Sequence, residues 1–202
     1  MPALFLMPPT VPMSMLPNAE TLIDQLIDHL RPQVGPATAM VGIATGGAWV
    51  AERLHQALGL SVPLGLVDIS FYRDDYSSSG LKASVKPSRI PFDVEGADIL
   101  LVDDVLYTGR TTRAALNELF DYGRPRRVRL VVLADRDERQ LPVAAQFVGA
   151  TVPVPPGCSL ELRRDSQGVL ALALEARIDA GNTTAAVSGA PGGADAAGGS
   201  GR

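Results

Sequence analysis

Cysteine is nearly absent from this chain of 202 residues, which contains only Cys158. A single cysteine excludes an internal disulfide framework and any CxxC zinc or redox site, and is typical of a cytoplasmic protein. Aromatic residues are also few, at 5%, whereas hydrophobic residues make up 46%. This composition suffices for the core of one domain. The net charge of −4 argues against a surface that binds nucleic acid or anionic lipid all over.

Long hydrophobic runs are missing as well, since none approaches the ~18 residues of a membrane-spanning helix. The opening MPALFLMPPTVPMSML has no basic residue and four prolines, so it resembles neither a signal peptide nor a membrane anchor. We expect residues 1–17 to be a disordered leader. Residues 180–202 are rich in glycine, alanine and serine, which predicts a disordered tail. The domain is then expected at residues 18–179.

Strand-like and helical segments alternate along this domain. Asn18 is a good N-cap for a first helix, which Pro32 ends. The predicted strands cover residues 39–43, 63–71, 99–102 and 127–134; the later helices cover residues 48–58 and a segment ended by Gly123. Alternation of this kind predicts an α/β fold with a mostly parallel, doubly wound sheet.

Two segments depart from the alternation. The stretch from Tyr72 to Pro91 is polar and lacks apolar periodicity, which is typical of a functional flap or of disorder. Beyond Pro142, alternating residues on both sides of Ser166-Gln167-Gly168 predict a C-terminal β-hairpin. This hairpin would either cap a site or meet a second subunit.

The segment ILLVDDVLYTGRTTRAAL, residues 99–116, carries the densest chemistry. Its turn from Val105 to Thr112 opens a helix, where free backbone amides and the positive end of the helix dipole favour an anion. Three threonine hydroxyls add donors, and Gly109 allows a close backbone approach. The turn therefore predicts a binding site for a phosphate monoester.

Two acids, Asp103 and Asp104, precede this turn and would repel the same phosphate unless they faced another group. Vicinal ribose hydroxyls or a divalent cation are natural partners, so a sugar phosphate satisfies both halves of the segment. A Walker loop and a dinucleotide GxGxxG turn are both absent. A phosphorelay receiver and a plain solvated turn remain weaker readings.

The segment resembles the phosphoribosyl pyrophosphate motif of type I phosphoribosyltransferases. Its flanks LVDISFYRDD, KPSRIPFDVEG, DDVLYTGRTTRAALNELFDYGRP and DRDERQLPVAAQFVG resemble the PyrR family over residues 18–178. The resemblance implies conversion of uracil and phosphoribosyl pyrophosphate to UMP and pyrophosphate, with Mg²⁺, in a dimer or tetramer. It also implies regulation of pyrimidine genes through leader RNA. Orotate or a purine is the alternative base.

The resemblance also implies roles for individual residues. Asp103 and Asp104 would hold the ribose hydroxyls and, partly through water, Mg²⁺. The 5′-phosphate would be cradled by Val105, Leu106, Tyr107, Thr108, Gly109, Arg110, Thr111 and Thr112. Thr45, Gly46 and Gly47 match the pyrophosphate loop, although many members have arginine where this chain has Gly46.

The polar stretch matches the mobile catalytic hood of the family. Lys82, Lys86 and Arg89 would fold over the pyrophosphate and stabilise its growing charge, and Arg89 is the preferred ligand. Arg136 would contact the nucleotide or base, or else form a surface ion pair. Trp49 is interpreted as packing beside the glycine turn, with base stacking as the alternative. His29, His55 and Cys158 are expected to be structural or on the surface.

RNA binding needs a local basic patch, because phosphate contacts dominate it. The candidates are Arg124, Arg126, Arg127, Arg129 and Arg139. Many relatives read DRGHRELPIRADF where this chain reads DRDERQLPVAAQF, so Glu138 replaces a histidine and Ala144 an arginine. These changes favour catalysis over attenuation, with an attenuator of little catalytic activity as the alternative.

Overall fold

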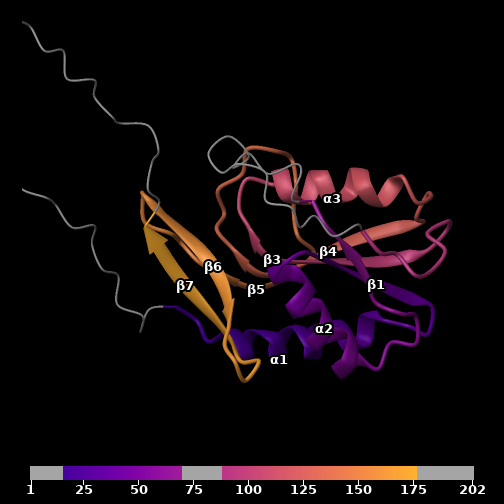
Figure 1. The fold of residues 1–202 in the computed structure, drawn as a ribbon, viewed down its shortest axis with the longest axis horizontal. Helices are drawn as coiled ribbons and strands as arrows, with labels where there is room; N and C mark the ends of the chain where they lie inside the picture. The colour runs from indigo at the N-terminus through magenta and orange to yellow at the C-terminus, as the bar shows by residue number, and fades with distance from the viewer. Residues whose placement is uncertain (1–15, 70–87, 177–202) are drawn as a thin grey trace, which may run out of the picture.

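The computed structural model describes residues 16–69 and 88–176, which form an α/β layered fold with a separate hairpin (Figure 1). The central sheet is entirely parallel, in the order β2-β1-β3-β4-β5. Its strands are β1 (Thr38–Ile43), β2 (Gly65–Val67), β3 (Asp98–Leu106), β4 (Arg127–Asp135) and β5 (Phe147–Thr151). The predicted fold class is confirmed.

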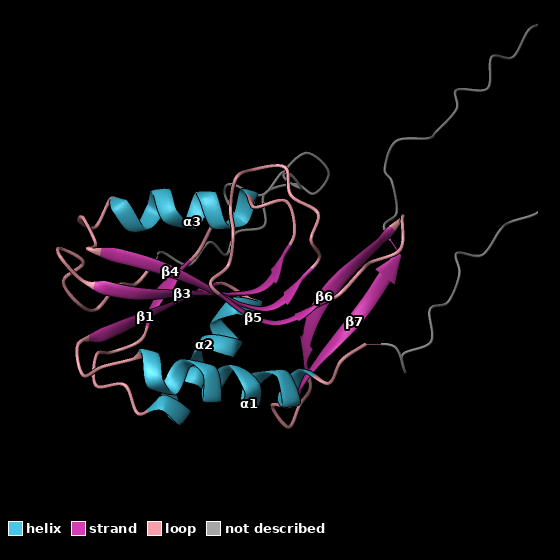
Figure 2. Ribbon diagram, turned by 180° about the vertical axis from the view of Figure 1, so that it is seen from behind, coloured by secondary structure: helices cyan, strands magenta, loops and turns pink. Residues whose placement is uncertain are grey.

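Helices cover both faces of this sheet (Figure 2). The helices are α1 (Ala19–Leu30), α2 (Gly46–Leu58) and α3 (Arg110–Phe120), with a 3-10 turn, η2 (Arg31–Gln33), after α1. Asn18 caps α1 as predicted, because its Oδ1 accepts a hydrogen bond from the Thr21 N–H at 3.0 Å. Gly59, with φ +63°, supplies the left-handed residue that ends α2.

Two apolar layers hold the helices to the sheet, and β3 contributes to both. Side chains of a strand alternate between its faces. Leu100 and Val102 belong to the layer that includes α1 and α2, whereas Ile99 and Leu101 pack in the layer that includes α3. All four are fully buried, so β3 is the centre of the fold.

Glycines bring α2 unusually close to the strands beneath it. A Cβ on Gly42 in β1 would lie 2.8 Å from Ala48 Cα, and one on Gly47 would lie 2.5 Å from Val102 O and 2.8 Å from Asp103 Cα. Neither position has room for a methyl group. The first turn of α2 therefore touches the backbone of β3 beside the two acids.

The hairpin consists of antiparallel strands β6 (Cys158–Arg164) and β7 (Leu170–Ala176). Leu160 and Leu162, on alternate positions of β6, pack into the layer that includes α1 and α2. Glu20 Oε1 accepts the Leu170 N–H at 2.9 Å, which attaches the hairpin to α1. The predicted hairpin is confirmed, and its Asp165 caps the turn through the N–H groups of Gln167 and Val169.

Several predicted boundaries change. Within the described part of the strand predicted at residues 63–71, which ends at residue 69, only Gly65–Val67 form a strand. This strand, β2, lies at the edge of the sheet, paired with β1 and bridged to Arg89 at Leu66 alone. β3 continues to Leu106, and α2 begins at Gly46, two residues earlier than predicted. Three expected segments lie wholly or partly outside the described residues: residues 1–15 of the leader, the whole tail, and the hood up to residue 87. In the part that is described, no helix combines the length and apolarity needed to cross a membrane.

The packing of Gly47 predicts a large effect of one methyl group. Gly47→Ala should lower the free energy of unfolding by about 1 to 3 kcal/mol, the usual cost of overpacking. Gly35→Ala is the matched control, because a Cβ there has no neighbour within 4 Å. Urea unfolding of both variants measures the difference, and equal stability would contradict the close approach of α2 to β3.

Candidate active site

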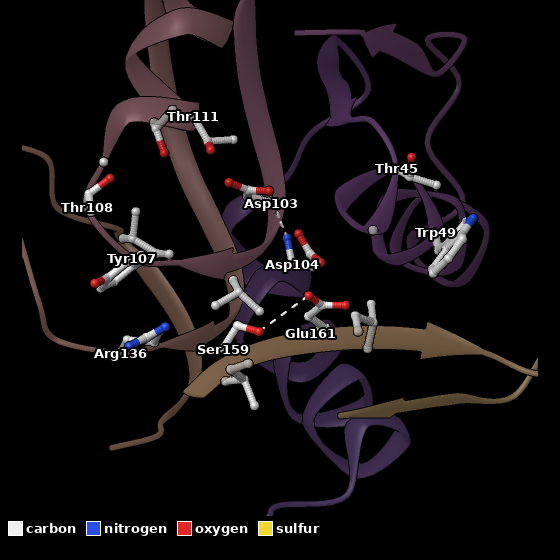
Figure 3. Close-up of a pocket in the computed structure, with 17 residues that line it drawn as sticks. Thr45, Trp49, Asp103, Asp104, Tyr107, Thr108, Thr111, Arg136, Ser159 and Glu161 are labelled. Atoms are coloured by element: carbon white, nitrogen blue, oxygen red, sulfur yellow. Dashed lines mark hydrogen bonds between the residues drawn. The ribbon is translucent and has the colours of Figure 1, made fainter. Parts of the chain in front are cut away.

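A cavity of about 420 Å³ opens at the carboxyl end of β3. Four parts of the chain line it: the β1–α2 loop with the first turn of α2, the segment from the end of β3 into α3, Arg136 just after β4, and strand β6 (Figure 3). Parallel α/β sheets commonly bind ligands at this end of their strands. The position agrees with the segment that the sequence singled out.

Asp103 and Asp104 both line the cavity. The strand predicted from the sequence ended at residue 102, before the acids, whereas β3 continues through both of them. Asp103 pairs with Val132 of β4, and the pairing of β3 with β1 ends at Val102. Asp103 is buried, and its Oδ1 accepts the N–H of Asp104 at 3.0 Å. The acids therefore occupy a rigid part of the sheet.

The turn after β3 and the first turn of α3 form the neighbouring wall. Gly109 has φ +89°, and the Thr108 carbonyl accepts the N–H groups of Gln140 and Leu141 at 3.1 Å each, which anchors the turn. Helix geometry leaves the first N–H groups of α3 without an i−4 acceptor. Thr112 Oγ1 is buried and has no hydrogen-bond partner among the described residues. The wall thus offers donors to an anion.

The predicted phosphate turn lines the cavity almost completely. Val105 to Thr112 contribute every residue except Arg110. The Arg110 guanidinium instead donates to Gln140 Oε1, through Nε at 3.3 Å and Nη2 at 3.2 Å. Sequence reasoning could not separate Arg110 from its neighbours, because the direction of a side chain depends on the packing of the loop opposite.

The β1–α2 loop faces the acids from the other side. Thr45 and Gly46 line the cavity, whereas Gly47 packs against β3 and does not. A Cβ on Gly46 would lie 3.0 Å from Asp104 Cβ and closer still to the carboxyl group. The Asp104 side chain therefore occupies the space that a side chain at position 46 would need.

Arg136 lies in the cavity wall and is 7% exposed. Its guanidinium carbon is 3.8 Å from the centroid of the Tyr107 ring, and its Nη2 donates to Glu138 Oε1 at 2.9 Å. Its Nε is buried with no hydrogen-bond partner in the described residues. The sequence left two alternatives for Arg136, contact with a ligand or a surface ion pair. In the structure Arg136 both lines the cavity and forms an ion pair, but it is buried rather than on the surface.

Strand β6 supplies the wall that sequence reasoning missed. Ser159 and Glu161 belong to this wall, and Figure 3 shows them projecting from β6 on the side of the acids. The hairpin thus caps the cavity, one of the two alternatives for it. The signal was the strict alternation in CSLEL, which places Ser159 and Glu161 on the face opposite to the leucines.

Trp49, in the first turn of α2, both packs against the core and lines the cavity. The guanidinium of Arg164 lies 5.0 Å from its ring centroid, and Arg164 also pairs with Glu52 at 3.5 Å. These contacts connect the hairpin with α2. The packing interpretation of Trp49 fits, and its ring is also available to the cavity.

Comparison with known proteins agrees with this geometry. The family described as phosphoribosyl transferase domain matches residues 14–155. A bifunctional protein PyrR of Pseudomonas fluorescens is 51% identical over 141 residues, covering 68% of this chain and 84% of the relative. One from Ralstonia nicotianae is 48% identical over 158 residues, covering 76% of this chain and 90% of the relative.

This chain belongs to the PyrR family. Solved structures of phosphoribosyltransferases share its fold. A hypoxanthine phosphoribosyltransferase from Trypanosoma cruzi superposes with a TM-score of 0.54 at 22% identity, covering 68% of this chain and 80% of that one. A purine phosphoribosyltransferase from Pyrococcus horikoshii gives 0.51 at 25% identity, covering 66% and 81%.

The hood residues predicted from the PyrR resemblance are placed only in part. Lys82 and Lys86 lie outside the described residues. Arg89 forms an isolated antiparallel bridge with Leu66 of β2, with backbone hydrogen bonds of 2.7 and 2.8 Å. Its side chain is exposed and does not line the cavity. Contact between Arg89 and a ligand stays a prediction.

The arginines predicted to contact RNA divide into two places. Arg126, Arg127 and Arg129 surround the carboxylate of Asp98 at 3.4, 2.5 and 3.7 Å, at the amino ends of β3 and β4, away from the cavity. Arg129 is also buried and donates to Gln33 O at 3.2 Å. One carboxylate therefore offsets part of the charge of this cluster.

Arg139 lies at the opposite end of β4 and supports the cavity wall. Its guanidinium donates to Tyr107 O at 2.9 Å, to Val143 O at 3.1 Å and to Asp135 Oδ2 at 2.5 Å. These bonds connect the phosphate turn with the segment after β4. The five predicted RNA contacts therefore do not form one continuous patch in the described structure.

The Asp98 cluster predicts a pH-dependent contribution to stability. Hydrogen bonding to Arg127, opposed by burial, lowers the pKa of Asp98. The contribution is therefore complete above the ordinary aspartate pKa of about 3.9. It is lost as the pH falls through the lowered value.

Asp98→Asn should reduce the free energy of unfolding at pH 7 by about 1 to 3 kcal/mol. The difference from wild type should shrink as the pH falls below 4, roughly the ordinary pKa. Chemical unfolding at several pH values checks this, with the exposed Asp24→Asn as the control. A difference that is constant with pH would contradict the ion cluster as its cause.

Proposed function

We propose that this chain transfers the 5-phosphoribosyl group of phosphoribosyl pyrophosphate to uracil, which yields UMP and pyrophosphate. One observation carries the proposal: paired carboxylates on β3 and the donor-rich start of α3 line the same cavity. The first suits the vicinal hydroxyls of a ribose, and the second suits its 5′-phosphate. Membership of the PyrR family supports uracil as the base.

Asp103 and Asp104 act on the ribose ring in this proposal. Ionised carboxylates accept strong hydrogen bonds from hydroxyl groups, and the β3 backbone holds both at a fixed position. Thr108, Thr111 and Thr112 face the 5′-phosphate with their hydroxyls. The buried Thr112 hydroxyl, which lacks a partner among the described residues, gains one when the phosphate binds.

The two acids also fit the Mg²⁺ ion that the family implies. Mg²⁺ prefers oxygen ligands and is usually held by one or two carboxylates together with substrate oxygens and water. Among the described residues, no group of three or more acidic, histidine or cysteine side chains is placed to hold a metal. Bound there, Mg²⁺ would neutralise charge on the pyrophosphate.

The reaction breaks the bond between C1 and a pyrophosphate oxygen and forms a bond between C1 and the base nitrogen, which loses a proton. Positive charge develops on the ribose ring in such a transfer, so the protein acts by placement and charge stabilisation. Thr45 and Gly46 approach the leaving group with backbone amides. The family resemblance assigns Lys82, Lys86 and Arg89 to stabilise the charge of this group.

No side-chain nucleophile is required, and the three candidates have other positions. His29 is exposed on α1, and Nε2 of His55 lies 2.7 Å from Val62 O. Cys158 is buried at the start of β6. None of the three lines the cavity.

A second candidate function is UMP-sensitive binding of pyrimidine leader RNA. The arginines around Asp98, together with the exposed Arg124, favour it, because they concentrate positive charge at one edge of the sheet. The engagement of Arg129 and Arg139 within the fold favours catalysis instead. If the protein formed no UMP but bound a pyrimidine leader transcript in a salt-dependent gel-shift assay, RNA binding would become the favoured function.

The test of the main proposal is a panel of nucleobases with phosphoribosyl pyrophosphate, with and without Mg²⁺. We expect UMP from uracil, dependence on Mg²⁺, and little product from orotate, cytosine or hypoxanthine. Light scattering in the same buffers tests the expected dimer or tetramer. Product from a purine alone would overturn the choice of base.

Asp104→Asn should weaken use of phosphoribosyl pyrophosphate by about 1.5 to 3 kcal/mol, the range of a lost charged hydrogen bond. The measurement is kcat/KM for that substrate, with the exposed Asp121→Asn as the control. Unchanged kcat/KM in the variant would remove Asp104 from the ribose site.

Gly109→Val should abolish most UMP formation, because it strains a residue at φ +89° and places a side chain 3.2 Å from Val143. The control is Gly96→Val, which has a similar φ of +68° and no neighbour within 4 Å. Both variants are compared by thermal unfolding and by initial rate. Full activity of Gly109→Val would place the phosphate elsewhere.

A further inference from the structure

The β6 wall carries a carboxylate that the proposed chemistry has not used. Glu161 lines the cavity on the same strand face as Ser159, and Ser159 Oγ lies 3.4 Å from Glu161 Oε1 as a hydrogen-bond donor. Figure 3 shows both side chains projecting from β6 below Asp103 and Asp104. The two residues therefore present a linked hydroxyl and carboxyl group to a ligand.

The hairpin holds these two side chains at a defined place. Leu160 and Leu162 alternate with them and are buried in the core, so β6 cannot slip by one residue without exposing both leucines. Arg164 at the end of β6 contacts Trp49 and Glu52 of α2. The β6 wall thus belongs to the rigid fold.

Charge indicates which part of the ligand Glu161 faces. A carboxylate repels the 5′-phosphate and the pyrophosphate, and these groups already have donor-rich loops in the proposed function. Glu161 also does not join Asp103 and Asp104 in a metal-binding cluster among the described side chains. The remaining part of the ligand is the base, whose ring N–H groups need an acceptor.

We propose that Glu161 is a specificity-determining residue, whose carboxyl oxygen accepts the ring N–H between the two carbonyl groups of uracil. The Ser159 hydroxyl, which has a single proton, turns from Glu161 to donate to one of those carbonyls when the base binds. This inference rests on the proposed transfer to uracil. Cytosine has a bare ring nitrogen with a lone pair at the corresponding position. This nitrogen and the carboxylate of Glu161 are both hydrogen-bond acceptors, so no bond forms between them and cytosine is rejected.

Glu161 can accept the uracil N–H in both protonation states, whereas rejection of cytosine requires the ionised carboxylate, which only accepts. Burial, and then the neighbouring carboxylate of Glu175, raise the pKa of Glu161. A protonated carboxyl group still has one oxygen that accepts a hydrogen bond. Glu175 itself pairs with Arg163 on the same hairpin and does not line the cavity.

Steady-state kinetics with uracil and with phosphoribosyl pyrophosphate test this inference. Glu161→Ala should raise KM for uracil about ten- to hundredfold, the effect of losing one hydrogen bond to a charged group. KM for phosphoribosyl pyrophosphate should change less than threefold. Glu161→Gln should recover much of the loss, because its amide oxygen still accepts the ring N–H.

Glu20→Ala is the matched control, because it removes a carboxylate that holds the same hairpin through the Leu170 N–H and pairs with Arg53, without touching the cavity. We expect its KM for uracil to equal that of wild type. Thermal unfolding of all variants, and calorimetric binding of phosphoribosyl pyrophosphate, identify any loss of fold. Equal losses in Glu161→Ala and Glu20→Ala would assign Glu161 to hairpin structure and overturn the inference.

Failure of the inference is distinguishable from failure of the proposed function. If wild type forms no nucleotide from any base, the proposed transfer itself is wrong. If wild type forms UMP and Glu161→Ala keeps its KM for uracil, only the assignment of Glu161 is wrong. A rise in the ratio of cytosine to uracil use in Glu161→Gln would support it further, because the amide can donate to the ring nitrogen of cytosine.

Discussion

The site depends on the close contact between the first turn of α2 and the backbone of β3. Gly47 permits this contact, since any Cβ there would lie within 2.8 Å of Asp103 Cα. It brings the β1–α2 loop against the acids at the end of β3. Because the sheet is parallel, the start of α3 emerges at the same edge. This contact and the parallel sheet together place the β1–α2 loop, the end of β3 and the start of α3 around the cavity.

That arrangement also explains how acids and an anion cradle coexist. Asp103 pairs with β4 and Asp104 lies within the same strand, whereas the threonine hydroxyls begin at Thr108, after β3 has ended at Leu106, and continue into α3. Arg139 connects Tyr107 with the segment after β4, so the turn cannot collapse onto the acids. The acids favour hydroxyl groups and the donors favour a phosphate. Because the turn keeps the two apart, one ligand with hydroxyls at one end and a phosphate at the other can bind both.

The part of the site that could be predicted depends on local sequence, and the part that was missed depends on tertiary packing. Residues 99–116 are contiguous, so strand, turn and helix chemistry could be predicted from their order alone. The alternation in CSLEL indicates that Ser159 and Glu161 share one face of β6, but their position at the cavity depends on packing of the hairpin leucines in the core layer that includes α1 and α2, which the local pattern does not give. The direction of Arg110 depends likewise on Gln140.

The departures of this chain from the family pattern have structural counterparts near the cavity. Gly46 replaces an arginine of many relatives, and the Asp104 side chain takes the space beside it. Glu138 replaces a histidine, and its carboxylate pairs with Arg136, which is thereby held against Tyr107 in the cavity wall. The negative charge of Glu138 is thus paired within the cavity wall. The two departures act in different ways, because Gly46 leaves room for the Asp104 carboxylate, whereas Glu138 orders an arginine beside the cavity.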